Sequence, residues 1–133
     1  AAQNAALNRV QDQIDFVKCD IMRDFPECPS DGGFDVIVSN PPYIPPRDIE
    51  RLASKVRDFE PRRALDGGED GLDFYRRLIP MWAGKLRSGG LFAVEIGEEQ
   101  GQAVSRIFEG AGFNPEIVRD YSGHDRIVRS IKQ

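Results

Sequence analysis

The chain has few metal-binding side chains and no long hydrophobic run. It holds two cysteines and one histidine in 133 residues. Cys19 and Cys28 are too far apart for a CxxC pair, so both are expected to be reduced structural residues, and no metal site is expected. No apolar run approaches the roughly 20 residues that a membrane helix needs, so no membrane span is expected. The chain does not open like a signal peptide, which makes the cytoplasm the expected location.

The chain also lacks an excess of positive charge. The chain has 18 Lys and Arg residues against 22 Asp and Glu residues, a net charge of -4, and its pI is near 5.0. A surface that holds a nucleic-acid backbone by itself needs clustered Lys and Arg side chains. The composition therefore favours a protein or small-molecule partner, and direct nucleic-acid binding is not expected.

What the sequence does contain is an alternation of helical and extended patterns. The spacing of apolar residues predicts helices over 1–9, 72–86 and 100–110, and strands over 14–19, 34–39, 91–96, 116–119 and 126–131. Residues 48–59 form a weak helix pattern, and residues 61–71 predict a long loop. Glycines at a turn over 88–90 are expected to separate the second helix from the strand that follows it.

This alternation predicts one α/β domain with a doubly wound sheet, closed by an antiparallel pair of strands. The run 34–39 is β-branched and almost wholly apolar, which is typical of a central parallel strand covered on both faces. Ligands of such folds bind at the carboxyl ends of strands. Asp20 and Asn40 are both predicted to lie at such ends.

The segment Asn40-Pro41-Pro42-Tyr43 follows the apolar strand directly and has features that suit the binding of a planar amide or amine. The Asn40 side-chain oxygen and the Pro41 carbonyl can accept the two N–H groups of an amide. The two prolines stiffen these acceptors in advance. The Tyr43 ring offers a face for stacking and for a cation. Read more simply, the segment is a turn that closes a strand, since Asn and Pro are common in turns.

The segment resembles the [Asn/Asp]-Pro-Pro-[Tyr/Phe] motif of S-adenosylmethionine methyltransferases that act on planar nitrogens. Further segments are similar to the release-factor glutamine methyltransferase (PrmC/HemK) family: 44–45, 56–61, 64–75, 86–90, 95–97, 100–101 and 125–126. The stretch Ala-Leu-Asp-Gly-Gly at 64–68 is the most specific of these. The resemblance covers nearly the whole chain in order.

The resemblance implies S-adenosylmethionine as cofactor and methylation of a glutamine in peptide chain release factors, which are thus the expected protein partner. It implies that Asn40, Pro41 and Tyr43 are catalytic, that they and Pro42 bind the glutamine, and that Asn40 also lies near the cofactor. Asp20 and Ile21 match positions that meet the adenine. The alternative for Asp20 is a helix N-cap or a solvated strand end.

The resemblance also implies a Rossmann-like methyltransferase fold that is incomplete at its amino-terminal side. The chain lacks the Gly-rich turn between strands and the acidic residue that hold a nucleotide cofactor in such folds. Residues 1–133 are therefore expected to be part of a catalytic domain, without an amino-terminal substrate-recognition domain and with weak cofactor binding of their own. An open gap in the sheet is expected beside the strand that ends at Asn40.

Two other functions stay open. One is methylation of an exocyclic amine of adenine or guanine in nucleic acid, which shares the motif but would need a basic surface. The other is a noncatalytic fragment that binds a partner. The acidic residues Asp66, Glu69, Asp70 and Asp73 are interpreted as a solvated loop because their spacing is not that of a calcium loop. His124 is interpreted as a loop residue.

Overall fold

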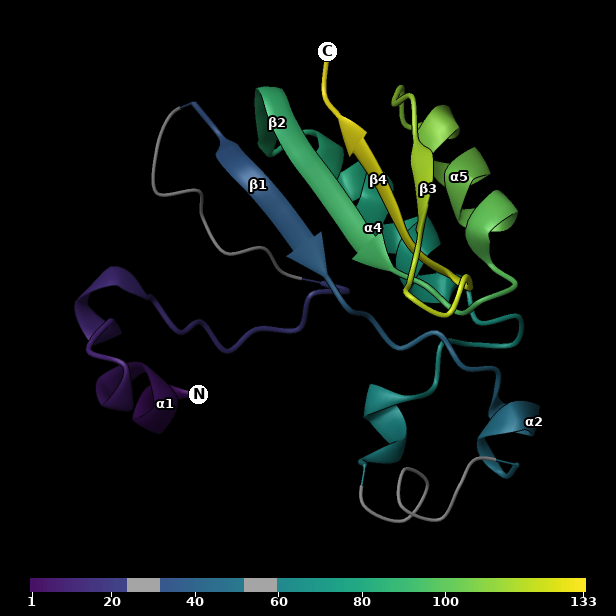
Figure 1. Ribbon diagram of the computed structural model, residues 1–133, viewed down its shortest axis with the longest axis horizontal. Helices are drawn as coiled ribbons and strands as arrows, with labels where there is room; N and C mark the ends of the chain where they lie inside the picture. The colour runs from purple at the N-terminus through teal and green to yellow at the C-terminus, as the bar shows by residue number, and fades with distance from the viewer. Residues whose placement is uncertain (24–31, 52–59) are drawn as a thin grey trace.

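The computed structural model describes residues 1–23, 32–51 and 60–133. Its elements, in chain order, are α1 (Ala2–Leu7), the 3₁₀ helix η1 (Gln11–Gln13), β1 (Phe34–Ser39), α2 (Pro46–Ile49), the 3₁₀ helix η2 (Arg62–Ala64), α4 (Asp73–Ala83), β2 (Leu86–Glu95), α5 (Gly101–Gly110), β3 (Glu116–Arg119) and β4 (Asp125–Ile131). Figure 1 shows the strands side by side, with α1 apart from them near the N-terminus.

The four strands form one mixed sheet in the order β1-β2-β4-β3. β1 runs parallel to β2, with Ser39 opposite Val94. β4 is antiparallel to β2 on one side and to β3 on the other. Because β1 and β2 are parallel, their carboxyl ends meet at the same edge of the sheet. The chain that leaves β1 at Asn40 therefore lies beside the end of β2 at Glu95.

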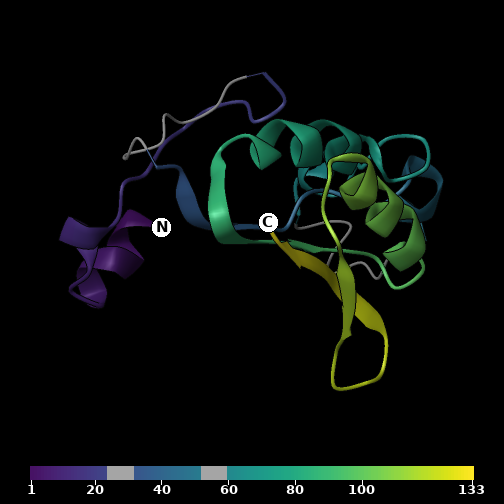
Figure 2. The ribbon, with the colours of Figure 1, turned by 90° about the horizontal axis from the view of Figure 1, so that it is seen from above.

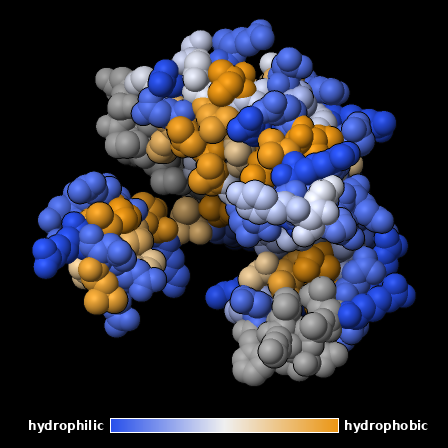
Figure 3. Space-filling model, viewed as in Figure 1, coloured by the Kyte–Doolittle hydropathy of each residue, from blue (hydrophilic) through white to orange (hydrophobic). Residues whose placement is uncertain are grey.

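Helices α4 and α5 cover one face of the sheet (Figure 2). α4 buries Tyr75, Leu78 and Ile79, which share one side of a helix at their spacing. α5 buries Val104 and Phe108 in the same way. Figure 3 shows apolar side chains exposed over the strands on the view of Figure 1, between largely hydrophilic surroundings.

An aromatic cluster fixes α5 on the sheet. The ring centroids of Phe92 and Phe108 are 5.2 Å apart, and those of Phe108 and Phe113 are 5.5 Å apart in an edge-to-face arrangement. Such pairs stabilise a core by about 1 kcal/mol beyond the area they bury. Phe92 comes from β2, so this cluster holds the strand that ends at Glu95.

The structure confirms the α/β class, the helices predicted over 72–86 and 100–110, the parallel strand over 34–39 and the closing antiparallel pair. The helix predicted over 1–9 is confirmed as the shorter α1. The predicted loop over 61–71 contains only the short helix η2. Of the weak helix predicted over 48–59, Asp48 and Ile49 belong to α2, and 52–59 lie outside the described residues.

Three expectations were wrong. Residues 14–19 form no strand, because no described strand lies beside them to pair with their backbone, and Phe16 and Val17 are 53% and 62% exposed. β1 is an edge strand of the described sheet, which agrees with the open gap expected beside it, but its Val38 is 74% exposed, so β1 is neither central nor covered on both faces there.

The third wrong expectation is the turn over 88–90. β2 already begins at Leu86, and these residues lie within it as an irregularity, where the partner of β1 jumps from Leu86 to Leu91. Gly89 has a φ of 75°, which glycine adopts without strain. The glycines therefore mark an irregular stretch of backbone, but this stretch is a bulge inside a strand and not the turn before its start. No described helix is long and apolar enough to cross a membrane.

Candidate active site

The Asn40–Tyr43 segment leaves the carboxyl end of β1 and runs past the end of β2. Asn40 is exposed and Pro41 is buried. The prolines have no backbone N–H to satisfy, so this stretch needs no strand partner on its donor side. Asn40 is thus held at the end of a strand with its side chain accessible.

The Tyr43 side chain is half-buried and anchored to β2. Its hydroxyl donates a hydrogen bond of 3.2 Å to Oε1 of Glu95. Burial, and then the negative charge of Glu95, raise the pKa of the Tyr43 hydroxyl above its usual value, and the Arg126 guanidinium opposes part of that rise. Tyr43 therefore stays protonated near neutral pH and can keep donating to Glu95.

A second tyrosine supports the same end of β2. Tyr75 of α4 is fully buried, and its hydroxyl donates to the Glu95 carbonyl over 2.8 Å. Burial raises the pKa of Tyr75 far above its usual value. Glu95 thus accepts from Tyr43 with its side chain and from Tyr75 with its backbone.

The loop after η2 packs directly on the backbone that follows the prolines. Ile44 N donates to the Leu65 carbonyl over 2.9 Å, and Gly67 N donates to the Ile44 carbonyl over 3.0 Å. A Cβ on Gly67 would lie 2.6 Å from the Tyr43 Cα, which no side chain tolerates. The glycine is therefore needed for this close approach, which explains why it stands in the Ala-Leu-Asp-Gly-Gly stretch.

Asn40 lies on the walls of two hollows. One, of about 280 Å³, is lined by Val38, Ser39, Asn40, Ala93, Val94, Glu95 and Ile127. The other, of about 350 Å³, is lined by Asn40, Pro41, Pro42, Tyr43, Ile44, Glu60, Ala64 and Leu65. A residue that borders two hollows can contact two different molecules at once, which a two-substrate reaction requires.

The structure does not bring Asp20 or Ile21 to these two hollows. Oδ1 of Asp20 accepts from Met22 N over 3.0 Å, and its carboxylate is 3.6 Å from the Arg23 guanidinium. Asp20 therefore orders its own turn. Ile21 lines a separate hollow with residues of β1 and with Leu78 and Trp82.

The carboxylates of the acidic loop form ion pairs and hydrogen bonds within turns. Asp70 and Asp73 both pair with Arg76 of α4, and the hydrogen bond from Arg76 lowers the pKa of Asp70. Asp66 accepts from Gly68 N over 3.0 Å. In the ranges that the structure describes, no three metal-binding side chains come together.

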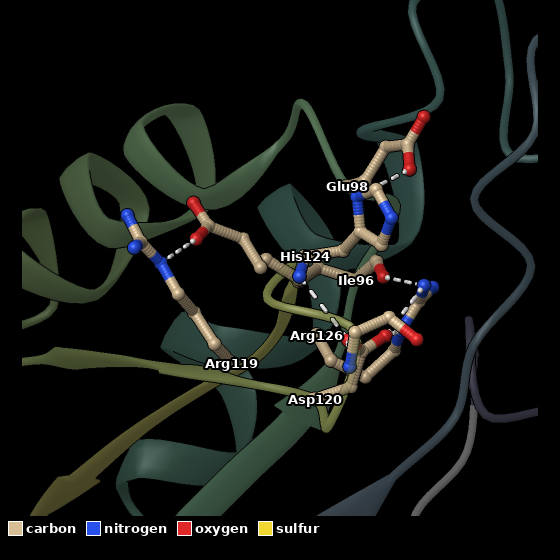
Figure 4. Close-up of polar contacts among 8 residues, drawn as sticks. Ile96, Glu98, Arg119, Asp120, His124 and Arg126 are labelled. Atoms are coloured by element: carbon tan, nitrogen blue, oxygen red, sulfur yellow. Dashed lines mark hydrogen bonds and ion pairs between the residues drawn. The ribbon is translucent and has the colours of Figure 1, made fainter.

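The hairpin between β3 and β4 carries the polar cluster of Figure 4. Arg126 donates to the Asp120 carboxylate and, over 3.4 Å, to the Ile96 carbonyl just beyond β2. Although burial raises the pKa of Asp120, hydrogen bonds from the His124 and Ser122 N–H groups and from Arg126 outweigh it and keep that pKa low. His124 lies in the loop, as expected, 3.1 Å from Glu98.

Sequence reasoning missed two residues of this region as parts of the site. Glu95 and Gln100 stood only within segments of family resemblance, although both contact Tyr43. A carboxylate at the end of an apolar strand was the available signal for Glu95. Nothing local in the sequence marked Gln100.

Comparison with known proteins gives one family match and several relatives. The family model described as Eco57I restriction-modification methylase matches residues 2–66. A release factor glutamine methyltransferase of Caulobacter vibrioides is 54% identical over 100 residues, which cover 74% of this chain and 35% of the relative. One of Thermodesulfovibrio yellowstonii is 40% identical over 129 residues, covering 96% of this chain and 44% of the relative.

A solved structure is also similar. The protein-(glutamine-N5) methyltransferase (release factor-specific) of Alicyclobacillus acidocaldarius matches with 30% identity and a TM-score of 0.49, over 76% of this chain and 50% of that one. The chain spans less than half of the length of the two curated relatives. Identities of 40% to 54% over most of the chain nevertheless show common descent. The aligned residues place the chain in the family of the release factor glutamine methyltransferases.

Proposed function

We propose that this chain carries the amide-binding part of an enzyme that transfers a methyl group from S-adenosylmethionine to the side-chain amide nitrogen of a glutamine in a peptide chain release factor. The observation that carries the proposal is the position of Asn40. It lies on the wall of two hollows, one bounded by Glu95 and one by the prolines and Tyr43.

The hollow lined by Asn40, Pro41, Pro42 and Tyr43 suits the glutamine amide. An amide nitrogen is a poor nucleophile because its lone pair is delocalised into the carbonyl. The Asn40 side-chain oxygen and the Pro41 carbonyl accept its two N–H groups and aim the nitrogen toward the other hollow. Acceptors fixed in advance by proline also stabilise the positive charge that develops on nitrogen.

The hollow beside Glu95 suits the reactive end of the cofactor. Its wall is mostly apolar, with Val38, Val94 and Ile127, and carries the Glu95 carboxylate. A carboxylate favours a cationic sulfonium. When bound, S-adenosylmethionine supplies an electrophilic methyl group. Asn40 faces this hollow too, and Asp20 and Ile21 remain proposed contacts of the adenine.

No general base is needed among the residues of the chain. S-adenosylmethionine would supply the methyl group and retain the sulfur, and the residues around Asn40 would hold the amide nitrogen that receives the methyl group. The proton that the nitrogen must then lose passes to water. The chain's own residues therefore bind, orient and stabilise, and none of them is required to hold that proton.

Radiolabelled methyl transfer tests the proposal. The natural protein that contains this chain is incubated with labelled cofactor and, in parallel, with release factor, with the same factor carrying Gln→Ala in its Gly-Gly-Gln tripeptide, and with DNA. We expect label only on the unaltered release factor. Label on the Gln→Ala factor to the same extent would contradict the choice of glutamine.

A second candidate is methylation of an exocyclic amine in nucleic acid. The match of residues 2–66 to a restriction-modification methylase favours it, because that range includes Asn40–Tyr43. The net charge of -4 opposes it. Label on DNA but not on release factor would establish this second candidate. Label on neither would leave a noncatalytic, partner-binding role.

A further inference from the structure

Gln100 is the residue just before α5, and all of its side-chain polar groups bond to the loops around the site. Its Nε2 donates to the Tyr43 carbonyl over 3.0 Å and to the Gly71 carbonyl over 3.3 Å. Its Oε1 accepts from Gly97 N over 3.0 Å. One half-buried amide therefore joins the loop after β1, the acidic loop and the loop after β2.

The side chain does not serve its own helix. Gln100 is the N-cap residue of α5. The side chain of an N-cap residue commonly bonds the first free N–H groups of its helix, but α5 has no such side-chain bond. The Gln100 backbone carbonyl accepts from Val104 N in the ordinary way. The amide is thus directed away from α5 and toward Tyr43.

Two glycines leave the space that this amide occupies. A Cβ on Gly71 would lie 2.6 Å from Nε2 of Gln100 and 2.4 Å from the Tyr43 carbonyl oxygen. A Cβ on Gly97 would lie 3.2 Å from Oε1 of Gln100. The backbone therefore approaches the Gln100 amide from two sides. At position 71 the approach is so close that only glycine fits there.

Tyr43 is consequently held at both of its ends. Gln100 holds its carbonyl and Glu95 holds its hydroxyl. Two fixed points restrict both the path of the backbone after the prolines and the plane of the ring. Small displacements of groups that orient a substrate reduce rates strongly.

We propose that Gln100 is a positioning residue for methyl transfer, which fixes the Asn40–Tyr43 segment through the Tyr43 carbonyl. This inference rests on the proposed function. It is tested with the Gln100→Glu variant of the natural protein that contains this chain. Gln102→Glu is the matched control, because Gln102 is exposed one half-turn further along the same helix.

At pH 8 the new carboxylate of Gln100→Glu has no proton to donate and faces two carbonyls. We expect kcat for release factor to fall roughly tenfold, the size of effect that an unsatisfied polar contact produces. The cofactor Kd should stay unchanged. Below the carboxyl pKa the protonated acid again offers one donor and one acceptor, so the rate relative to the unmodified protein should recover as pH falls.

The control variant should match the unmodified protein at every pH. A Gln100→Glu variant that also matches it, or that loses activity in the same proportion at every pH while its melting temperature falls, would overturn the proposal. If Gln100→Glu does not fold, Gln100→Met replaces it, because methionine keeps the length of the side chain and carries no charge. This variant should lower kcat without recovery at low pH. Full activity of Gln100→Met would equally overturn the proposal. Absence of transfer by the unmodified protein would count against the proposed function instead.

Discussion

At the residue scale, the site depends on how Tyr43 is held. Its hydroxyl contacts Glu95 and its carbonyl contacts Gln100. The ring also packs against the core beneath it. A side chain with so many constraints presents its face in one orientation, which a stacked planar amide requires.

Replacing Tyr43 with Phe separates the ring from the hydroxyl. The variant keeps the stacking face and loses the hydrogen bond to Glu95, so we expect kcat to fall about threefold to tenfold, equivalent to roughly 1 kcal/mol. Tyr121→Phe is the control, since Tyr121 is fully exposed at the hairpin. Steady-state methyl transfer measures both. A Tyr43→Phe variant no different from the control would show that the hydroxyl contributes nothing.

At the element scale, the loop that contains Gly67 and Gly68 shapes the site, although neither glycine lines either hollow. Gly67 lies against the Tyr43 backbone, and the parallel bridge of Ile44 to Asp66 joins the two segments. This loop was the most specific part of the resemblance to the family. Its physical role, which is to brace the segment after the prolines, required the structure.

The Gly67→Ala substitution tests this role. Its methyl group would overlap the Tyr43 backbone, so the loop must move away, and we expect a loss of about 2 kcal/mol in the free energy of unfolding together with reduced methyl transfer. Gly110→Ala is the matched control because a Cβ there meets nothing within 4 Å. Urea unfolding and methyl transfer are measured on both variants. Equal behaviour of the two would contradict the bracing role.

Much of the secondary structure could be predicted from periodicity, but the position of a strand in the sheet could not. The stripe of α4 and the apolar run of β1 each define an element by local pattern. Burial of β1 depends on which elements lie beside it, and no local pattern carries that information. For the same reason the alternating residues 14–19 imitate a strand but have no described partner.

The residues of the candidate site divide in the same way, into those that a local pattern marks and those that it does not. Asn40 and the prolines were found because a rare local sequence follows a strong strand. Glu95 and Gln100 come from positions 52 and 57 residues beyond Tyr43. Only the parallel pairing of β1 with β2 brings them together, so a single sequence could not assign their contacts.

At the scale of the whole molecule, the buried Tyr75 and the half-buried Tyr43 make stability depend on alkaline pH. The pKa values of Tyr43 and Tyr75 are raised, mainly by burial, so the folded state keeps protons that the unfolded state releases above about pH 10. The free energy of unfolding should therefore fall as pH rises beyond that value. Tyr75→Phe should reduce the slope. Urea unfolding between pH 8 and pH 11 measures it, and identical slopes would contradict this account.

Cofactor binding is a second property of the whole molecule. The hollow beside Glu95 offers few polar groups, chiefly Ser39, Asn40 and Glu95, whereas a nucleoside with its ribose needs more hydrogen-bond partners. We therefore predict weak or undetectable binding of S-adenosylmethionine by residues 1–133 expressed alone. Isothermal titration calorimetry measures this directly. Micromolar affinity would contradict the prediction.

The central claim is that Asn40 holds the amide that is methylated. The most direct measurement is the rate of methyl transfer to release factor by the natural protein with Asn40→Ala, next to Asn114→Ala, an exposed asparagine that lines neither hollow at Asn40. Loss of one preorganised polar group at a reacting centre costs about a hundredfold. We predict that loss for Asn40→Ala and an unchanged rate for Asn114→Ala. Full activity of Asn40→Ala would contradict the claim.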